Sequence, residues 1–231
     1  MSVYGIGVGL LSTDARVYVA GHRGMVGSAI WRGLSSAGFT DLVGWGSAEV
    51  DLTSRDASMD AILSARPDVV VMAAARVGGI VANSTYPVEF LTDNIRIQSN
   101  VFEAAHAAGV DRLLFLGSSC IYPRLAPQPI PESALLTGPL ESTNDAYAIA
   151  KIAGIIGVQS YRREYGRRWI SAMPTNLYGP NDNFDLETAH VLPALIRRFH
   201  EAEQTGAPEV TLWVTGRSEE HTSELQSRQY L

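Results

Sequence analysis

The sequence contains only one cysteine, Cys120, among its 231 residues. A single cysteine excludes an intrachain disulfide framework and a zinc site built from several cysteines, and we expect no metal ion. The chain therefore suits a reducing compartment, and we expect it to be soluble and cytoplasmic. No apolar run reaches the ~18 residues that a membrane-spanning helix needs. Residues 1–11 lack the basic flank of a secretory signal, because the first cation is Arg16. We expect no membrane partner.

Charge is also scarce. Charged residues make up 18% of the chain, and 24 acids against 18 Lys and Arg leave a net charge of −6. A nucleic-acid-binding surface needs clustered Lys and Arg to displace counterions, and the sequence contains no such cluster. With 46% apolar residues, the composition indicates a globular protein that has no nucleic-acid partner.

Short β-branched runs alternate with helical stretches along the chain. This pattern predicts helices at residues 24–37, 54–65, 88–108, 146–165 and 191–202, and strands at 16–20, 41–45, 68–73, 113–116, 169–173 and 210–213. Thr53 precedes the second helix as its candidate N-cap. The alternation favours an α/β fold with a doubly wound parallel sheet of the Rossmann type, whose ligands gather at the carboxyl ends of the strands.

The chain divides by composition into four segments. We expect an N-terminal extension at residues 1–15, a dinucleotide-binding domain at 16–180 and the start of a second domain at 181–216. Residues 217–231 are polar and without a period, and their first eleven residues resemble the conceptual translation of a sequencing adapter. We therefore expect a non-native tail at 217–231.

The first candidate site is a glycine-rich turn between the first strand and the first helix, made of Gly21, His22, Arg23, Gly24, Met25, Val26 and Gly27. Glycines here permit a tight turn and close approach of a pyrophosphate, and the helix N-terminus supplies free N–H donors. A plain structural turn is the alternative. Residues 43–47 after the second strand contain neither the acid nor the cation that selects a dinucleotide. Arg23 favours NADP, unless it is a solvated loop charge.

The second candidate site combines Tyr147, Lys151 and Ser118. The tyrosine and the lysine are four residues apart on a predicted helix, so they share a face. A neighbouring ammonium lowers the pKa of a phenol, and such a tyrosine can transfer a proton to a substrate oxygen during hydride transfer. Ser118 follows the fourth strand, where its hydroxyl can bind the same oxygen. Separately these residues are typical of a surface pair and a turn cap, whereas together with the glycine turn they are specific.

These elements, with three alanines at 73–75, resemble the extended short-chain dehydrogenase/reductases. Longer stretches are similar to the GDP-L-fucose synthases, namely GHRGMVGSAI at 21–30, VGGIVAN at 77–83, LGSSCIYP at 116–123, NDAYAIAKIAG at 144–154, MPTNLYGPNDNF at 173–184 and HVLPALIRRFHEA at 190–202. The resemblance implies an enzyme that epimerises C3 and C5 of GDP-4-keto-6-deoxy-D-mannose and then reduces C4 with NADPH to give GDP-L-fucose. It also implies a homodimer.

The resemblance further implies a role for each catalytic residue. Tyr147 would protonate the C4 oxygen, Ser118 would hold that oxygen, and Lys151 would bind the nicotinamide ribose. Cys120 and His190 match the base and the acid of the epimerisation. A nearby cation can draw the pKa of a thiol towards neutrality, and a histidine titrates in that range. The alternatives are a small buried hydrophobe for Cys120 and a helix-start residue for His190.

Further cofactor contacts are implied beyond the glycine turn. They fall on Ser118, Lys151, His190, Leu52, Leu116, Gly117, Ser119, Pro174, Thr175, Asn176 and Leu177. Arg198 and Trp213 match positions that touch the GDP-sugar.

Two departures from the family pattern qualify these implications. Ser47 stands where the family usually has a basic residue, which leaves NAD open beside NADP. The pattern also ends near Gly216, so we expect most of the small C-terminal substrate domain to be missing. The remaining alternatives are another nucleotide-sugar epimerase or dehydratase, and an inactive cofactor-binding fragment.

Overall fold

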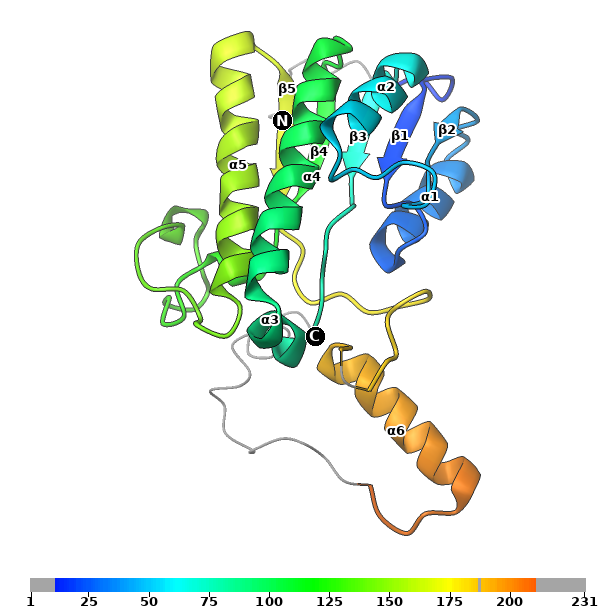
Figure 1. Cartoon of the computed structure of the whole chain (residues 1–231), viewed down its shortest axis with the longest axis vertical. Coiled ribbons are helices and arrows are strands. Elements are labelled where there is room, and N and C mark those ends of the chain that lie inside the picture. The colour runs from blue at the N-terminus through cyan, green and yellow to red at the C-terminus, as the bar shows by residue number, and fades with distance from the viewer. Residues whose placement is uncertain (1–10, 187, 211–231) are drawn as a thin grey trace, which may run out of the picture.

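The computed structural model describes residues 11–186 and 188–210. A five-stranded sheet forms its centre (Figure 1). All neighbouring strands are parallel and their order in space is β2-β1-β3-β4-β5. The strands are β1 (Val17–Ala20), β2 (Leu42–Val43), β3 (Val69–Met72), β4 (Arg112–Leu116) and β5 (Arg168–Ala172). The order reverses between β1 and β3, which is the point where ligands bind in sheets of this kind.

Helices connect the strands and confirm the predicted Rossmann-type α/β fold. They are α1 (Met25–Ser36), α2 (Arg55–Ala65), α3 (Ile80–Thr85), α4 (Pro87–Ala107), α5 (Asp145–Tyr165) and α6 (Val191–Thr205), with short 3-10 helices η1 (Ser119–Ile121) and η2 (Glu132–Ala134). In the described part of the chain, no helix is both long enough and apolar enough to cross a membrane. The same residues contain no group of three or more His, Cys, Asp and Glu side chains that could hold a metal ion.

Three local predictions differ from the structure. The second strand is limited to two residues, since Gly44 and Gly46 follow it directly. Ser54, not Thr53, caps α2, because the Ser54 hydroxyl accepts from the N–H of Ala57 at 3.4 Å. The short helix α3 was not predicted, because its sequence continues into α4 with a break only at Tyr86. The predicted strand at 210–213 lies outside the described residues except for Val210.

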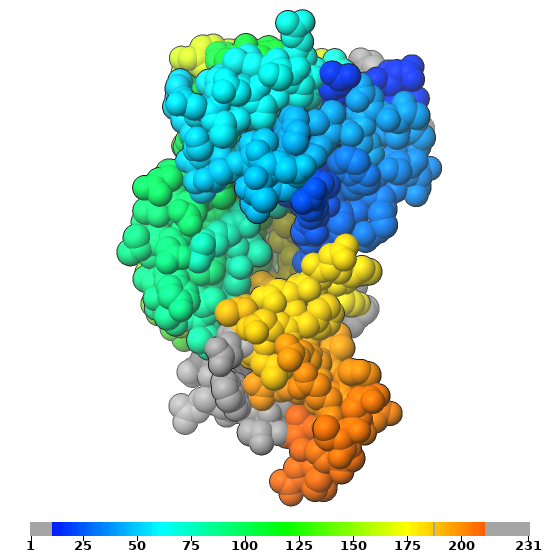
Figure 2. All heavy atoms as spheres, turned by 45° about the vertical axis from the view of Figure 1, so that its right-hand side comes forward, coloured from blue at the N-terminus to red at the C-terminus, as the bar shows by residue number. Residues whose placement is uncertain are grey.

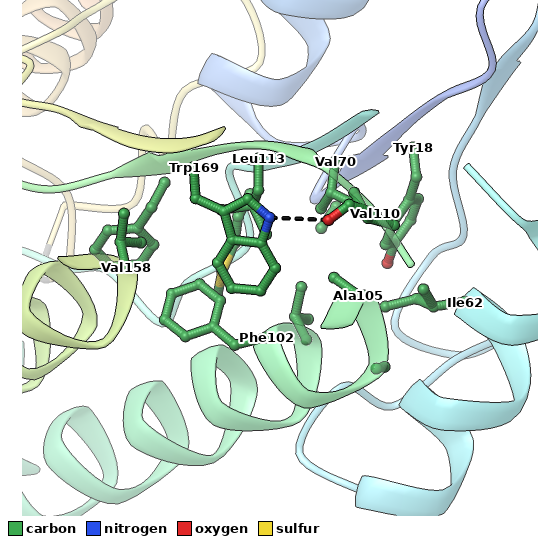
Figure 3. Close-up of a cluster of buried hydrophobic side chains, with 14 of the residues drawn as sticks. Tyr18, Ile62, Val70, Phe102, Ala105, Val110, Leu113, Val158 and Trp169 are labelled. Carbon is green, nitrogen blue, oxygen red and sulfur yellow. Dashed lines mark hydrogen bonds between the residues drawn. The ribbon is translucent and has the colours of Figure 1, made fainter. Parts of the chain in front are cut away.

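The main core lies between one face of the sheet and helices α2, α4 and α5 (Figure 1). Trp169 on β5 is fully buried against Phe102 of α4, and its indole N–H donates to the carbonyl of Val110 at 3.1 Å (Figure 3). The hydrogen bond satisfies the one polar group of the indole, so the large ring is buried without an unpaired donor. This face therefore has the largest apolar burial in the domain, and it fixes the two long helices on the sheet.

The opposite face is covered more thinly. Val17, Val19 and Val71 are buried there under apolar side chains of α1 that include Ile30 and Trp31. The central strands are thus apolar on both faces, as strands covered by helices on each side should be. Helix α6 projects away from the sheet (Figure 1).

Candidate active site

The glycine turn has the geometry of a dinucleotide cradle. Gly21 has a φ of +81°, and a Cβ on it would lie 2.8 Å from the backbone of Ala74. A Cβ on Gly27 would lie 2.1 Å from the carbonyl oxygen of Gly21. Gly24 is the N-cap of α1 and has no side chain to cover its first turn. The sequence thus brings bare backbone and a helix N-terminus to the switch point, which fits a pyrophosphate.

Two side chains of the same turn point to the segment after β2. His22 packs against Trp31, with ring centroids 5.2 Å apart, and its Nδ1 is buried without a hydrogen-bond partner. Burial, followed by the charge of Arg23, lowers the pKa of His22. Arg23 forms an ion pair with Glu49 at 3.0 Å. Arg23 is therefore a paired charge and not merely a solvated one.

Lys151 is buried beneath the end of β4. Only 5% of the residue is exposed, and its Nζ donates to the carbonyl of Leu116 at 2.9 Å. The ammonium also lies 5.0 Å from the ring centroid of Phe115 and 5.6 Å from that of Tyr147. Burial lowers the pKa of Lys151 to about 8, while the neighbouring Cys120 acts in the opposite direction. The faces of the two rings and the carbonyl oxygen attract the positive charge of the ammonium, so these contacts hold the Lys151 side chain in place.

The predicted lowering of the Tyr147 pKa is wrong for this structure. Burial raises the pKa of Tyr147 well above its usual value, Cys120 raises it further, and only the hydrogen bond to Ser118 lowers it. The reason is geometric, because the Lys151 ammonium faces the ring of Tyr147 and the benefit to a phenolate is smaller than the cost of its desolvation. Tyr147 therefore keeps its hydroxyl proton and can act as a proton donor.

Cys120 joins the same group of side chains. Its Sγ donates to the hydroxyl oxygen of Ser118 at 3.2 Å. Burial raises the pKa of the Cys120 thiol, although the Ser118 hydrogen bond and the Lys151 charge both lower it, so the predicted shift towards neutrality is wrong here as well. Ser118, Cys120, Tyr147 and Lys151, below called the strand-end cluster, are thus assembled at the carboxyl end of β4. η1 begins directly after Ser118 and turns Cys120 back towards that hydroxyl.

His190 and Arg198 lie on a different element. His190 is the exposed N-cap residue of α6, and Arg198 is half-buried within that helix. The segment is joined to the N-terminus of α3 through the N–H of Gly79, which donates to the carbonyl of Thr188 at 2.9 Å. The pairing of His190 with Cys120 stays a prediction. Trp213 and the expected tail at 217–231 lie outside the described residues.

The other predicted cofactor residues border the same end of the sheet. Gly117 donates its N–H to the carbonyl of Ala172 at 2.8 Å, which ties the ends of β4 and β5 together. The carbonyl of Leu52 accepts from the amide of Asn100 at 2.9 Å. A recess opens between the turn after β1, the region of α3 and the segment that follows β5 (Figure 2). This last segment begins with the predicted residues Pro174, Thr175, Asn176 and Leu177, of which all but Pro174 are exposed.

Two positioning residues on α4 were not predicted from the sequence. The Asn94 side chain accepts from the N–H of Arg76 at 2.9 Å and donates to the carbonyls of Arg76 and Phe90. Gln98, one turn further, donates to the carbonyl of Ala150 at 2.8 Å. Asn94 holds the loop after β3, and Gln98 holds α5 next to Lys151. Their signal in the sequence is two amides at helical spacing on an otherwise apolar face.

Residues 17–220 match the NAD dependent epimerase/dehydratase family. The chain belongs to this family. It is 61% identical over 204 residues to GDP-L-fucose synthase 1 of Arabidopsis thaliana, a match that covers 88% of this chain and 63% of that protein. It is 57% identical over 201 residues to GDP-L-fucose synthase of Escherichia coli, with 87% and 63% covered.

A solved structure agrees with these relatives of the epimerase/dehydratase family. The GDP-L-fucose synthetase from Naegleria fowleri bound to NADP is similar with a TM-score of 0.80 and 32% identity, over 89% of this chain and 67% of that one. The chain spans less than two thirds of the length of the two curated relatives above. The family membership covers the glycine turn and the strand-end cluster alike.

Proposed function

We propose that the chain carries the catalytic centre of a GDP-L-fucose synthase. It would epimerise C3 and C5 of GDP-4-keto-6-deoxy-D-mannose and then reduce C4 with NADPH to give GDP-L-fucose. The single observation that carries this proposal is the place of Cys120. Its thiol is hydrogen-bonded to Ser118 and lies next to Tyr147 and the Lys151 charge, and a reductase with one proton donor has no need of a second acid/base group there.

The reduction would depend on the Tyr147 hydroxyl. When bound, NADPH supplies the hydride that is added to C4. Tyr147 then gives its proton to the C4 oxygen, and the Ser118 hydroxyl orients that oxygen by a hydrogen bond. The raised pKa of Tyr147 keeps the proton on the phenol until negative charge develops on the substrate. Lys151, next to the ring, stabilises the phenolate that is left.

The epimerisation would depend on Cys120 and His190. The 4-keto group acidifies the protons on C3 and C5, so a base removes a proton from one face and an acid returns one to the other. Cys120 needs its thiolate for this step, and the Ser118 hydroxyl can reverse its role and donate to that thiolate. The Lys151 charge lowers the pKa of Cys120 in the same direction. His190, on the separate helix α6, would supply the opposite face.

The residues of the glycine turn fit the dinucleotide. The positive φ of Gly21 and the missing Cβ of Gly27 leave space for the pyrophosphate at the N-terminus of α1. The Naegleria fowleri relative is described as bound to NADP. We assign NADP to this cradle, with Lys151 on the nicotinamide ribose and Arg23 at the adenosine end.

A homodimer is the proposed assembly. Helices α4 and α5 cover the sheet side by side (Figure 1) and expose Ile95, Ile149 and Ile156 on their outer surface. Two such pairs of helices can bury these side chains as a bundle. Light scattering should give twice the chain mass, and Ile149→Glu should shift it to one chain. A reducing compartment such as the cytoplasm suits the proposal, because Cys120 must remain a thiol.

The experiment that tests the proposed function is NADPH oxidation driven by GDP-4-keto-6-deoxy-D-mannose, with the 231-residue chain and with Tyr147→Phe. We expect turnover by the wild-type chain that the substitution lowers by about 10³-fold while NADPH still binds. Cofactor binding without turnover on this sugar would contradict the substrate assignment.

A further inference from the structure

A carboxylate occupies the place next to the glycine turn where an anion would bind. One oxygen of Glu49, Oε2, accepts from the N–H of Gly46 at 2.6 Å and from Nη2 of Arg23 at 3.0 Å. A main-chain N–H and a guanidinium that converge on one point make a site for an anionic oxygen. The side chains of Arg23 and Glu49 are 67% and 52% exposed, so both can move away from each other.

Gly46 is what allows this arrangement. The residue is buried, and a Cβ on it would lie 2.3 Å from Nη1 of Arg23 and 3.1 Å from Oε2 of Glu49. Any side chain at this position would therefore push the guanidinium off the backbone. The segment after β2 thus lets the Arg23 guanidinium lie against its backbone, with Glu49 as its present partner.

We propose that Glu49 determines dinucleotide specificity as an internal substitute for the 2′-phosphate. The carboxyl end of the second strand is where this fold receives the adenosine ribose. The Arg23 guanidinium and the Gly46 N–H lie there, and both donate to Glu49. To bind them, the 2′-phosphate of NADP must displace the Glu49 carboxylate. This inference rests on the proposed function, because it requires the glycine turn to hold a dinucleotide.

The consequence is a smaller preference for NADP than Arg23 alone would give. Glu49 neutralises the guanidinium and repels the incoming phosphate, and the exposed Ser47 adds no compensating charge. NAD has a free 2′-hydroxyl, which can donate to the Glu49 carboxylate where it stands. Glu49 therefore weakens binding of the phosphorylated ribose and leaves binding of the unphosphorylated one almost unchanged.

The test is calorimetric binding of 2′,5′-ADP and of 5′-AMP to the full chain, with no turnover required. We expect Glu49→Gln to tighten 2′,5′-ADP roughly five- to tenfold, the effect of removing one charge near a partly exposed phosphate. Binding of 5′-AMP should change less than twofold. The matched control is Asp60→Asn, which removes an exposed negative charge from α2 and should change neither affinity. The gain should shrink at high salt, because exposed charges are screened.

The remaining outcomes separate this inference from the proposed function. Adding Arg23→Ala to Glu49→Gln should remove the gain in affinity for 2′,5′-ADP, since the 2′-phosphate would no longer have the guanidinium to bind. Unchanged or weaker binding of 2′,5′-ADP by Glu49→Gln would overturn the inference and leave the proposed function intact. Failure of the wild-type chain and all variants to bind either nucleotide would contradict both.

Discussion

The strand-end cluster and the segment that carries His190 are held in place by different means. Ser118, Cys120, Tyr147 and Lys151 sit between a strand end and a helix that packs on the main core. The segment at 188–190 is connected to the N-terminus of α3 by a backbone hydrogen bond from Gly79 to Thr188. One region is fixed by packing, and the other by a close approach of two backbones. If the reduction uses the first and the epimerisation needs both, the two chemistries should respond differently to substitution.

The largest expected effect is that of Tyr147→Phe on the reduction. The substitution removes the proton donor and keeps the ring next to Phe90 and Lys151. NADPH oxidation should fall by about 10³-fold, within the range of general acid catalysis. Thermal unfolding should remain cooperative. A decrease smaller than tenfold would mean that another group protonates C4.

Cys120→Ser should have the opposite effect to Tyr147→Phe, because it should lower the epimerisation and spare the reduction. The thiol is lost from the epimerisation, whereas the contact with Ser118 can be kept by a hydroxyl. We expect formation of the epimerised product to fall by about 10²-fold while NADPH oxidation continues on the original sugar. Nuclear magnetic resonance of the reduced sugar distinguishes the two products. Equal loss of both products would contradict separate roles for Cys120 and Tyr147.

Gly79→Ala should disturb the segment of His190 alone. A Cβ at this position would lie 2.5 Å from the carbonyl oxygen of Ala189, so the segment must move. A displacement of this kind should lower epimerisation about tenfold, because catalytic groups are sensitive to small misplacements. Gly33→Ala is the matched control, since a Cβ on this exposed helix residue meets nothing within 4 Å. An equal effect on reduction would show that the region is one structural unit.

A further expected effect is a pH dependence of stability, not of activity, that originates in Lys151. Its pKa is about 8 in the folded chain and 10.5 when the side chain is in water, so between these pH values the unfolded chain binds more protons than the folded chain. The free energy of unfolding should therefore rise with pH from about 8 to 10. Lys151→Met should flatten this rise and add up to about 3 kcal/mol at pH 7. Urea unfolding at two pH values measures it, and an unchanged slope would exclude Lys151 as the source.

Much of the fold was predictable from local sequence. Short runs rich in valine predicted β1 and β3, and the glycine spacing predicted the turn at Gly21. The length of strand β2 and the existence of helix α3 were not predicted. The two glycines after β2 and the break at Tyr86 set the ends of these elements, and their effect depends on tertiary contacts. Packing overrides propensity in such short elements.

The residues of the candidate site were easier to predict from the sequence than the directions of their pKa shifts. The spacing of Tyr147 and Lys151 placed them on one face, and the structure agrees. The pKa shifts of Tyr147 and Cys120 went in the opposite direction, because burial depends on the whole core and is invisible in a four-residue spacing. Glu49 lies two residues beyond residues 43–47, where a charge that selects the dinucleotide was expected, and its role depends on the contact with Arg23.

The most direct test of two chemistries in one cluster is hydrogen exchange without cofactor. GDP-4-keto-6-deoxy-D-mannose is incubated with the 231-residue chain in deuterated water, in the absence of NADPH, and the sugar is examined by mass spectrometry. Because the proposed epimerisation uses only side chains of the protein, we expect deuterium at C3 and C5 in the wild-type chain and in Tyr147→Phe, but not in Cys120→Ser. Exchange by Cys120→Ser at the wild-type rate, or none in the wild-type chain, would contradict it.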